Sequence, residues 1–149
     1  MPCLAASYDP VTGALIQLTV LPPSHNSVSG VPPPAENLQV YNALIDTGAS
    51  CTCISRKVVS DLNLRPMGLV PVSGVHGTVP TNSFQFRVGF FASHSLSTGG
   101  TVSGNLIEFL VDGIVFDNRG CLFDILLGRD ILCKGSFSMA FNNQFIFCF

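Results

Sequence analysis

The tripeptide Asp46-Thr47-Gly48 is the part of this sequence whose residue types best suit chemistry. It follows the apolar run Ala43-Leu44-Ile45, so a lone carboxylate stands where a buried-looking strand ends. A turn aspartate is the plain structural alternative, because Asp-Thr-Gly is common turn chemistry. The apolar residues before it, and the pattern that resumes at Ile54 and leads into a helix, favour a functional carboxylate.

A second block far downstream strengthens this interpretation. The text "ALIDTGAS" at 43–50 and "DILLGRDIL" at 124–132 together resemble the retropepsin-like aspartic proteases. The order of segments is also similar, with a Gly-rich hairpin between the two blocks and short terminal strands after them. The resemblance implies a mostly β, single-domain acid-protease β-barrel with one or two short helices, active as a C2 homodimer.

The resemblance also implies roles for individual residues. Asp46 would be catalytic, Thr47 would turn its hydroxyl toward the partner's loop, Gly48 would let substrate backbone come close, and Ala49 completes the loop. The residues expected to support the site without performing chemistry are Leu126, Leu127, Gly128 and Arg129. The flap that covers substrate would have its tip at Ser73, Gly74, Val75, His76 and Gly77, with an ordinary β-turn as the alternative and a solvated loop histidine as the simpler interpretation of His76.

The chemistry of this family requires two carboxylates. One takes a proton from a water molecule while the other, protonated, polarises the scissile carbonyl. Two like charges about 3 Å apart share one proton and titrate as a unit. The chain has one Asp-Thr-Gly and no Asp-Ser-Gly, and Asp112-Gly113 is expected to be a hairpin turn. A twofold dimer would supply the second carboxylate from another copy of Asp46.

The last six residues, "QFIFCF", are apolar on both faces of a strand. Half-buried strands alternate apolar and polar residues, so this pattern favours a strand buried at a subunit interface, with an interior strand of the monomer as the alternative. The aromatic rings offered to that interface are Phe141, Phe145, Phe147 and Phe149.

Arg129 departs from the retroviral pattern. There, the corresponding arginine pairs with an aspartate whose position is Ser50 in this chain, so we expect Asp130 or Asp124 to pair with Arg129 instead. Asp124, which precedes a buried strand, is expected to accept structural hydrogen bonds.

Composition excludes several other functions. Charged residues make up 11% of the chain and apolar residues 47%, and seven Lys and Arg are scattered along it, so there is no electrostatic footprint for nucleic acid. The sequence shows no signal peptide and no apolar run long enough for a membrane span, which predicts a cytoplasmic protein. The six cysteines lack metal-ligand spacing, so we expect no metal or cofactor and buried, reduced thiols, with plain packing favoured over a redox role for Cys51 and Cys53.

The 14 glycines and 10 prolines divide the chain into short apolar segments, which is typical of strands and turns. Ser55 to Leu64 is the best early helix, capped by Ser55. We expect an N-terminal extension at 1–13 and a protease domain at 14–149. Within that domain we expect flexible loops at 22–37 and 93–104 and a flap hairpin at 70–86.

Three functional classes remain. The first is a homodimeric aspartic endopeptidase that binds an extended peptide or protein substrate. The second is a catalytically inactive module of the same fold that dimerises or binds peptides. The third is a β-structured assembly subunit, which leaves the two paired blocks unexplained.

Overall fold

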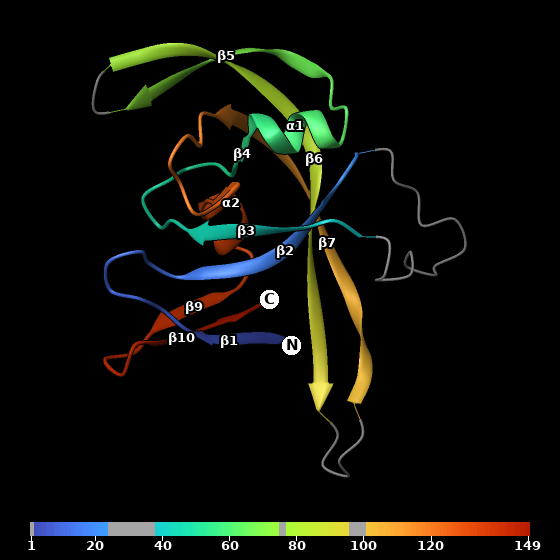
Figure 1. The fold of residues 1–149 in the computed structure, drawn as a ribbon, viewed down its shortest axis with the longest axis vertical. Coiled ribbons are helices and arrows are strands. Elements are labelled where there is room, and N and C mark those ends of the chain that lie inside the picture. Colours follow the sequence, from blue (N-terminus) through green and yellow to red (C-terminus); the bar gives the residue numbers. More distant parts are fainter. Residues whose placement is uncertain (1, 24–37, 75–76, 96–100) are drawn as a thin grey trace.

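The protein, seen in a computed structural model, is described over residues 2–23, 38–74, 77–95 and 101–149, and it is mostly β (Figure 1). Within those ranges the strands are β1 (Cys3–Ser7), β2 (Leu15–Leu21), β3 (Val40–Ile45), β4 (Cys53–Ser55), β5 (Pro66–Gly74), β6 (Gly77–Ser95), β7 (Thr101–Phe116), β8 (Ile125–Leu127), β9 (Ser136–Met139) and β10 (Gln144–Cys148). The two short helices are α1 (Arg56–Asp61) and α2 (Arg129–Leu132). None of the described helices could span a membrane.

Six strands close into a barrel in the order β2-β3-β8-β4-β7-β6, because β2 pairs with β6 as well as with β3. Two pairs in the ring, β3 with β8 and β4 with β7, are parallel. The side chains of β6 show how the barrel fills: Phe84, Phe86, Val88 and Phe90 alternate along the strand and all four are buried. This alternation places the bulk of the apolar core inside the ring.

The strands β5 and β6 continue beyond the barrel as a hairpin arm, drawn at the top of Figure 1. Their pairing runs from Pro66 with Phe84 to Gly74 with Gly77. The tip residues Val75 and His76 lie outside the described residues. The arm overlaps the hairpin expected at 70–86, and its role as a flap stays a prediction.

The helix α1 follows directly from β4. The Ser55 hydroxyl accepts a hydrogen bond from the Val58 amide at 3.3 Å and so caps the first turn, as the sequence predicts. The helix ends at Asp61, three residues before the expected boundary at Leu64, and its buried residue is Val58.

The chain ends form a separate three-stranded sheet in the order β1-β10-β9, which we call the terminal sheet. Its strands are antiparallel, with Ala5 opposite Ile146 and Ile146 opposite Ser138. The N-terminal segment expected to be an extension therefore contributes a strand to the fold. Figure 1 shows both termini beside this sheet, below β2.

The last strand is not buried on both faces, contrary to what its sequence pattern suggested, and its phenylalanines are buried without a partner subunit. Phe145 and Phe147 are 3% and 0% exposed within the single chain, and the ring of Phe147 lies 6.0 Å from that of Phe90 in the barrel. Ile146, between them, is 42% exposed on the opposite face. The strand thus alternates, with phenylalanines supplying the core and one isoleucine left outside.

The expected hairpin turn at Asp112-Gly113 is also wrong. β7 runs straight through both residues, and Gly113 pairs with Phe84. A Cβ at Gly113 would lie 2.4 Å from the Thr52 carbonyl oxygen and 2.7 Å from the Phe86 ring. Glycine stands here because two segments approach β7 closely, and no turn is needed. The neighbouring strands extend to Ser95 and from Thr101, so the expected loop at 93–104 is shorter, and its residues 96–100 lie outside the described residues.

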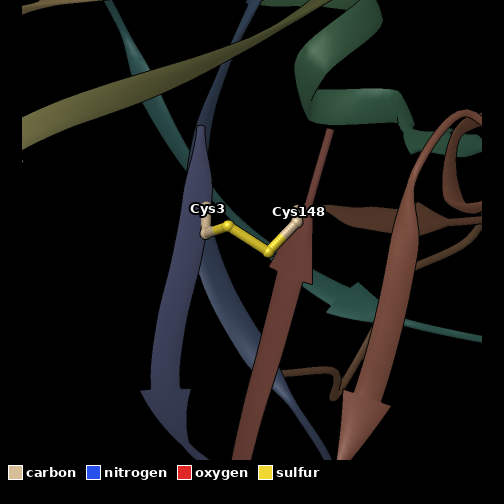
Figure 2. Close-up of a disulfide and its surroundings, with 2 residues drawn as sticks. All are labelled: Cys3 and Cys148. Carbon is tan, nitrogen blue, oxygen red and sulfur yellow. A yellow bond between two sulfur atoms is a disulfide. The ribbon is translucent and has the colours of Figure 1, made fainter. Parts of the chain in front are cut away.

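The expectation of reduced, buried cysteines is wrong for most of them. Cys3 and Cys148 form a disulfide that joins β1 to β10 (Figure 2). Cys121 and Cys133 are exposed thiols, Cys51 is half-buried, and Cys53 is the buried one. The pairing joins residues that are 145 positions apart in sequence, so no local pattern could indicate it.

Candidate active site

Asp46 lies where β3 leaves the barrel. β3 is a central strand, held by β2 on one side and by β8 on the other. The last ladder pair on the β8 side is Ile45 with Leu127, and the Asp46 amide continues the pattern by donating to the Leu127 carbonyl at 3.0 Å. The backbone at Asp46 is therefore held by its buried neighbours Ile45 and Leu127, whereas the residue itself is half-buried.

One oxygen of the Asp46 carboxylate is held by its own loop. Oδ1 accepts hydrogen bonds from the Gly48 amide at 2.8 Å and the Ala49 amide at 3.3 Å. This arrangement is an Asx-type turn, in which a short acidic side chain bonds the backbone two residues later. The other oxygen, Oδ2, accepts no hydrogen bond from the residues that the structure describes. The loop thus orients the carboxylate and leaves one oxygen available to a water molecule.

Gly48 leaves room for the carboxylate in this turn. A Cβ at Gly48 would lie 3.1 Å from Asp46 Oδ1, inside ordinary van der Waals contact. A side chain would therefore press on the oxygen that the loop holds. Thr47, between the two, is exposed and makes no side-chain hydrogen bond to described residues. Its hydroxyl is free to meet another molecule.

A latch between Thr52 and Asp130 fixes the other end of the loop. Asp130 accepts from the Thr52 amide at 2.9 Å and from the Thr52 hydroxyl at 2.7 Å. The same hydroxyl accepts from the Gly128 amide at 3.2 Å, and Thr52 is fully buried. Because one partner is charged, these bonds are among the stronger ones in a protein. The latch ties the Asp46 loop to the start of α2.

Two further contacts support the latch from the "LLGRD" segment. The Arg129 amide donates to the Ala49 carbonyl at 3.0 Å. A Cβ at Gly128 would lie 2.5 Å from the carbonyl group of Cys51, which is backbone and cannot move aside. Leu127 is fully buried and Leu126 is half-buried. The supporting role that the sequence suggested for 126–129 stays a prediction, and these contacts favour it.

The expected partners of Arg129 are not found. Its side chain is exposed, and no ion pair joins it to an acidic group among the described residues. Asp130 binds Thr52 instead. Asp124 accepts from the hydroxyl of Ser55 at 3.1 Å and from the side-chain amide of Asn118 at 2.9 Å. The expectation that Asp124 is a structural acceptor is confirmed.

Of the residues expected at the flap tip, Ser73, Gly74 and Gly77 lie on the hairpin arm, and Val75 and His76 lie outside the described residues. Ser73 and Thr78 face each other across the strands, with their hydroxyl oxygens 2.8 Å apart. Gly74 pairs with Gly77, which has a φ of 110°. Between these described residues and the Asp46 loop there is no hydrogen bond. Within the described part of a single chain, the hairpin arm and the Asp46 loop are therefore not connected by hydrogen bonds.

Cys53 lies next to the site but is chemically quiet. Burial raises the pKa of its thiol to about 12, and the neighbouring Cys51 adds to the shift. Its Sγ donates to the Cys51 carbonyl at 3.5 Å. Such a thiol stays protonated at neutral pH, which suits packing rather than nucleophilic chemistry. Among the described residues no cluster of His, Cys, Asp or Glu could hold a metal ion.

Sequence reasoning missed the Thr52–Asp130 latch. Thr52 carries no motif signal, and Asp130 was considered only as a partner of Arg129. The contact between the buried Thr52 hydroxyl and Asp130 depends on the tertiary structure, because the two residues are 78 positions apart in sequence. A buried threonine directly before the strand β4 has no signature in a single sequence.

The comparisons with known proteins agree with this geometry. A family model described as aspartyl protease matches residues 34–131, which is most of the chain. The structure resembles a retropepsin-like aspartic protease from Rickettsia conorii, with 14% identity, a TM-score of 0.53, and coverage of 97% of this chain and 89% of that one. It also resembles the EIAV protease complexed with the inhibitor HBY-793, with 18% identity, a TM-score of 0.51, and coverage of 87% and 93%. At these identities the two structures support the fold alone. A comparison with curated proteins finds no match.

The matched region contains Asp46, its loop, the hairpin arm and the "LLGRD" segment. The fold, the loop geometry and the family model therefore point the same way. This chain belongs to the aspartyl protease family and has the retropepsin-like fold.

Proposed function

We propose that the protein is an aspartic endopeptidase in which Asp46 from each of two copies forms the catalytic dyad. The observation that supports this most directly is the Asp46 carboxylate itself. One oxygen is held by two backbone amides, and the other accepts no hydrogen bond from the described chain. A carboxylate oriented in this way is suited to bind and deprotonate a water molecule.

The reaction needs a second carboxylate that this chain lacks. In the proposed dimer, one Asp46 is ionised and takes the proton of the water, while its mate is protonated and polarises the scissile carbonyl. The dyad must retain one proton, so we expect the highest activity at acidic to mildly acidic pH. The exposed hydroxyl of Thr47 is placed at the same surface and would face the partner's loop.

The hairpin arm would close over an extended substrate. Gly74 and Gly77 pair at the end of the described part of the arm, and these two glycines would permit a hinge-like movement. An extended peptide would bind by main-chain hydrogen bonds, as strands do when they join a sheet edge. The substrate class that follows is a peptide or an unfolded segment of a protein.

The terminal sheet is the surface we propose for the dimer. Its three strands contain no Asp, Glu, Lys or Arg, which matches the depletion of charge at the cores of interfaces. Ile146 is 42% exposed on the outer face, beside a groove of about 480 Å³. Small side chains line that groove, such as Ala5 on β1, Ser138 on β9 and Ala140 just after β9.

The dimer surface is tested by Ile146→Lys, with Val11→Lys as the matched control. Both positions are exposed and apolar, but Val11 lies in the turn after β1 and is 93% exposed. We expect Ile146→Lys to weaken the dimer by roughly tenfold or more and Val11→Lys to leave it unchanged, measured by sedimentation equilibrium. Equal association of all three proteins would remove the terminal sheet as the interface.

The activity is tested by incubating wild type and Asp46→Asn with a mixed peptide library from pH 3 to 7. We expect cleavage by the wild type alone. Equal cleavage by both, or none by either at any pH, would reject the enzyme and leave a non-catalytic dimerisation or peptide-binding module.

A further inference from the structure

The first strand of the terminal sheet is held by little apart from its disulfide. Four of the five residues of β1 are exposed, and only Leu4 packs partly against the core. β1 is an edge strand with β10 as its sole described neighbour. Edge strands with so little burial detach readily, because few apolar contacts resist opening.

Apart from the partial packing of Leu4, the non-covalent contacts around β1 include backbone hydrogen bonds and one hydroxyl hydrogen bond. The Tyr8 amide donates to the Asn143 carbonyl at 2.8 Å, and the Phe149 amide donates to the Pro2 carbonyl at 3.0 Å. The Tyr8 hydroxyl donates to the Ala140 carbonyl at 3.1 Å. Together with the five-residue ladder to β10, these bonds exchange easily with water at an exposed edge.

The disulfide lies at the N-terminal end of β1, at its first residue (Figure 2). Cys3 is opposite Cys148 in the ladder, on the same outer face as Ile146. Cys3 is exposed and Cys148 is half-buried. A small thiol can therefore reach the bond, since exposed disulfides are the labile ones.

We propose that Cys3–Cys148 is a redox-responsive clasp that keeps β1 in the terminal sheet and thereby controls whether that sheet can serve as an interaction surface. β1 contributes three of the residues that line the groove on this sheet, namely Ala5, Ala6 and Ser7. When β1 leaves, this wall of the groove leaves with it. The effect on dimerisation rests on the proposed function, whereas the effect on β1 does not.

The switching step is thiol–disulfide exchange with a dithiol. A thiolate of the dithiol attacks the sulfur of Cys3 and forms a mixed disulfide, while Cys148 leaves as a thiolate and takes up a proton. The second thiol of the dithiol then closes its own disulfide and releases Cys3 as a thiol. Two electrons pass from the dithiol to the protein, and the protein gains two protons.

Hydrogen exchange on the oxidised protein and on the protein reduced with dithiothreitol tests the clasp. We expect those amides of Leu4–Ser7 that bond to β10 to lose protection by about tenfold or more on reduction, while barrel amides such as Leu18 and Val88 keep theirs. The double variant Cys3→Ser/Cys148→Ser should behave as the reduced wild type does, with or without dithiothreitol. A variant with the exposed thiols replaced, Cys121→Ser/Cys133→Ser, should respond to dithiothreitol as the wild type does.

Equal protection of Leu4–Ser7 in the oxidised and reduced protein would overturn the clasp. Loss of protection across the whole barrel would also overturn it, because the bond would then hold the entire fold and not one strand. Sedimentation in parallel separates the two proposals. Reduction should weaken the association of the dimer by roughly tenfold or more. A protein that is monomeric in both states would contradict the proposed dimeric function, and the hydrogen-exchange result would still decide whether the disulfide holds β1.

Discussion

Replacing Thr52 by valine tests how the loop that carries Asp46 is held in place. The two side chains have nearly the same shape, so the change removes the hydroxyl and little else. That hydroxyl donates to Asp130 at 2.7 Å and accepts from the Gly128 amide at 3.2 Å. Thr52 is fully buried, so no water can replace the lost partner.

The expected loss of stability follows from these two bonds. A hydrogen bond to a charged group contributes about 1.5–3 kcal/mol, and a buried amide left without an acceptor costs about 1–3 kcal/mol. The free energy of unfolding should therefore fall by about 3–5 kcal/mol. For a chain of this size that corresponds to a melting temperature lower by about 10 °C.

Thr19→Val is the matched control, because Thr19 is also fully buried. Its hydroxyl donates to the Gln39 carbonyl at 2.8 Å, and Gln39 is exposed, so water can replace the lost donor. The cost there should be about 0.5–1.5 kcal/mol. Urea unfolding of the three proteins measures the difference. Equal losses for the two variants would refute the latch.

Three further predictions concern other described residues. Gly128→Ala should lower the free energy of unfolding by more than about 4 kcal/mol, because its Cβ would lie 2.5 Å from the Cys51 backbone. Gly68→Ala, whose Cβ would have no atom within 4 Å, should change it by at most about 0.5 kcal/mol, and similar losses in thermal melts of the two variants would contradict the prediction. The pKa of Cys53 is about 12 in the folded chain and about 8.5 when unfolded, so the protonated thiol's contribution to stability is complete below about pH 8.5 and declines by about 1.4 kcal/mol per pH unit above it. Urea unfolding measured from pH 7 to 10.5 should show that the stability of Cys53→Ala declines less steeply than that of the wild type. Parallel curves for the two proteins would contradict this. Thr47→Val should lower activity more than it lowers stability, because the hydroxyl is exposed in the single chain and would act only in the dimer; a matching loss of stability measured by urea unfolding would contradict that assignment.

Features with local signals were predictable from the sequence. The Ser55 cap rests on residues within a few positions of each other, because the Ser55 hydroxyl accepts a hydrogen bond from the Val58 amide. The candidate carboxylate was found because Asp46 follows a buried strand and precedes a glycine. The family motif supplied the fold.

Features set by contacts between distant segments were not predictable. Gly113 looks like a turn residue after Asp112, but it is glycine because the Thr52 carbonyl and the Phe86 ring lie against it. Phe145 and Phe147 were assigned to an interface, yet the barrel already buries them, and only Ile146 is left outside. The partner of Cys3 is 145 residues away, and Asp130 on α2 binds Thr52, which directly precedes β4 and is 78 residues away. Each of these depends on which segments the barrel brings together.

Mixing wild type with Asp46→Asn tests the shared dyad most directly. Wild-type protein at fixed concentration, high enough to be dimeric, is equilibrated with increasing amounts of the variant, and peptide cleavage is measured. If each active site needs Asp46 from both copies, activity should fall to about one half with one equivalent and to about one tenth with nine equivalents, because mixed dimers are inactive. Activity that stays constant as the variant is added would show that one carboxylate suffices and would contradict the account.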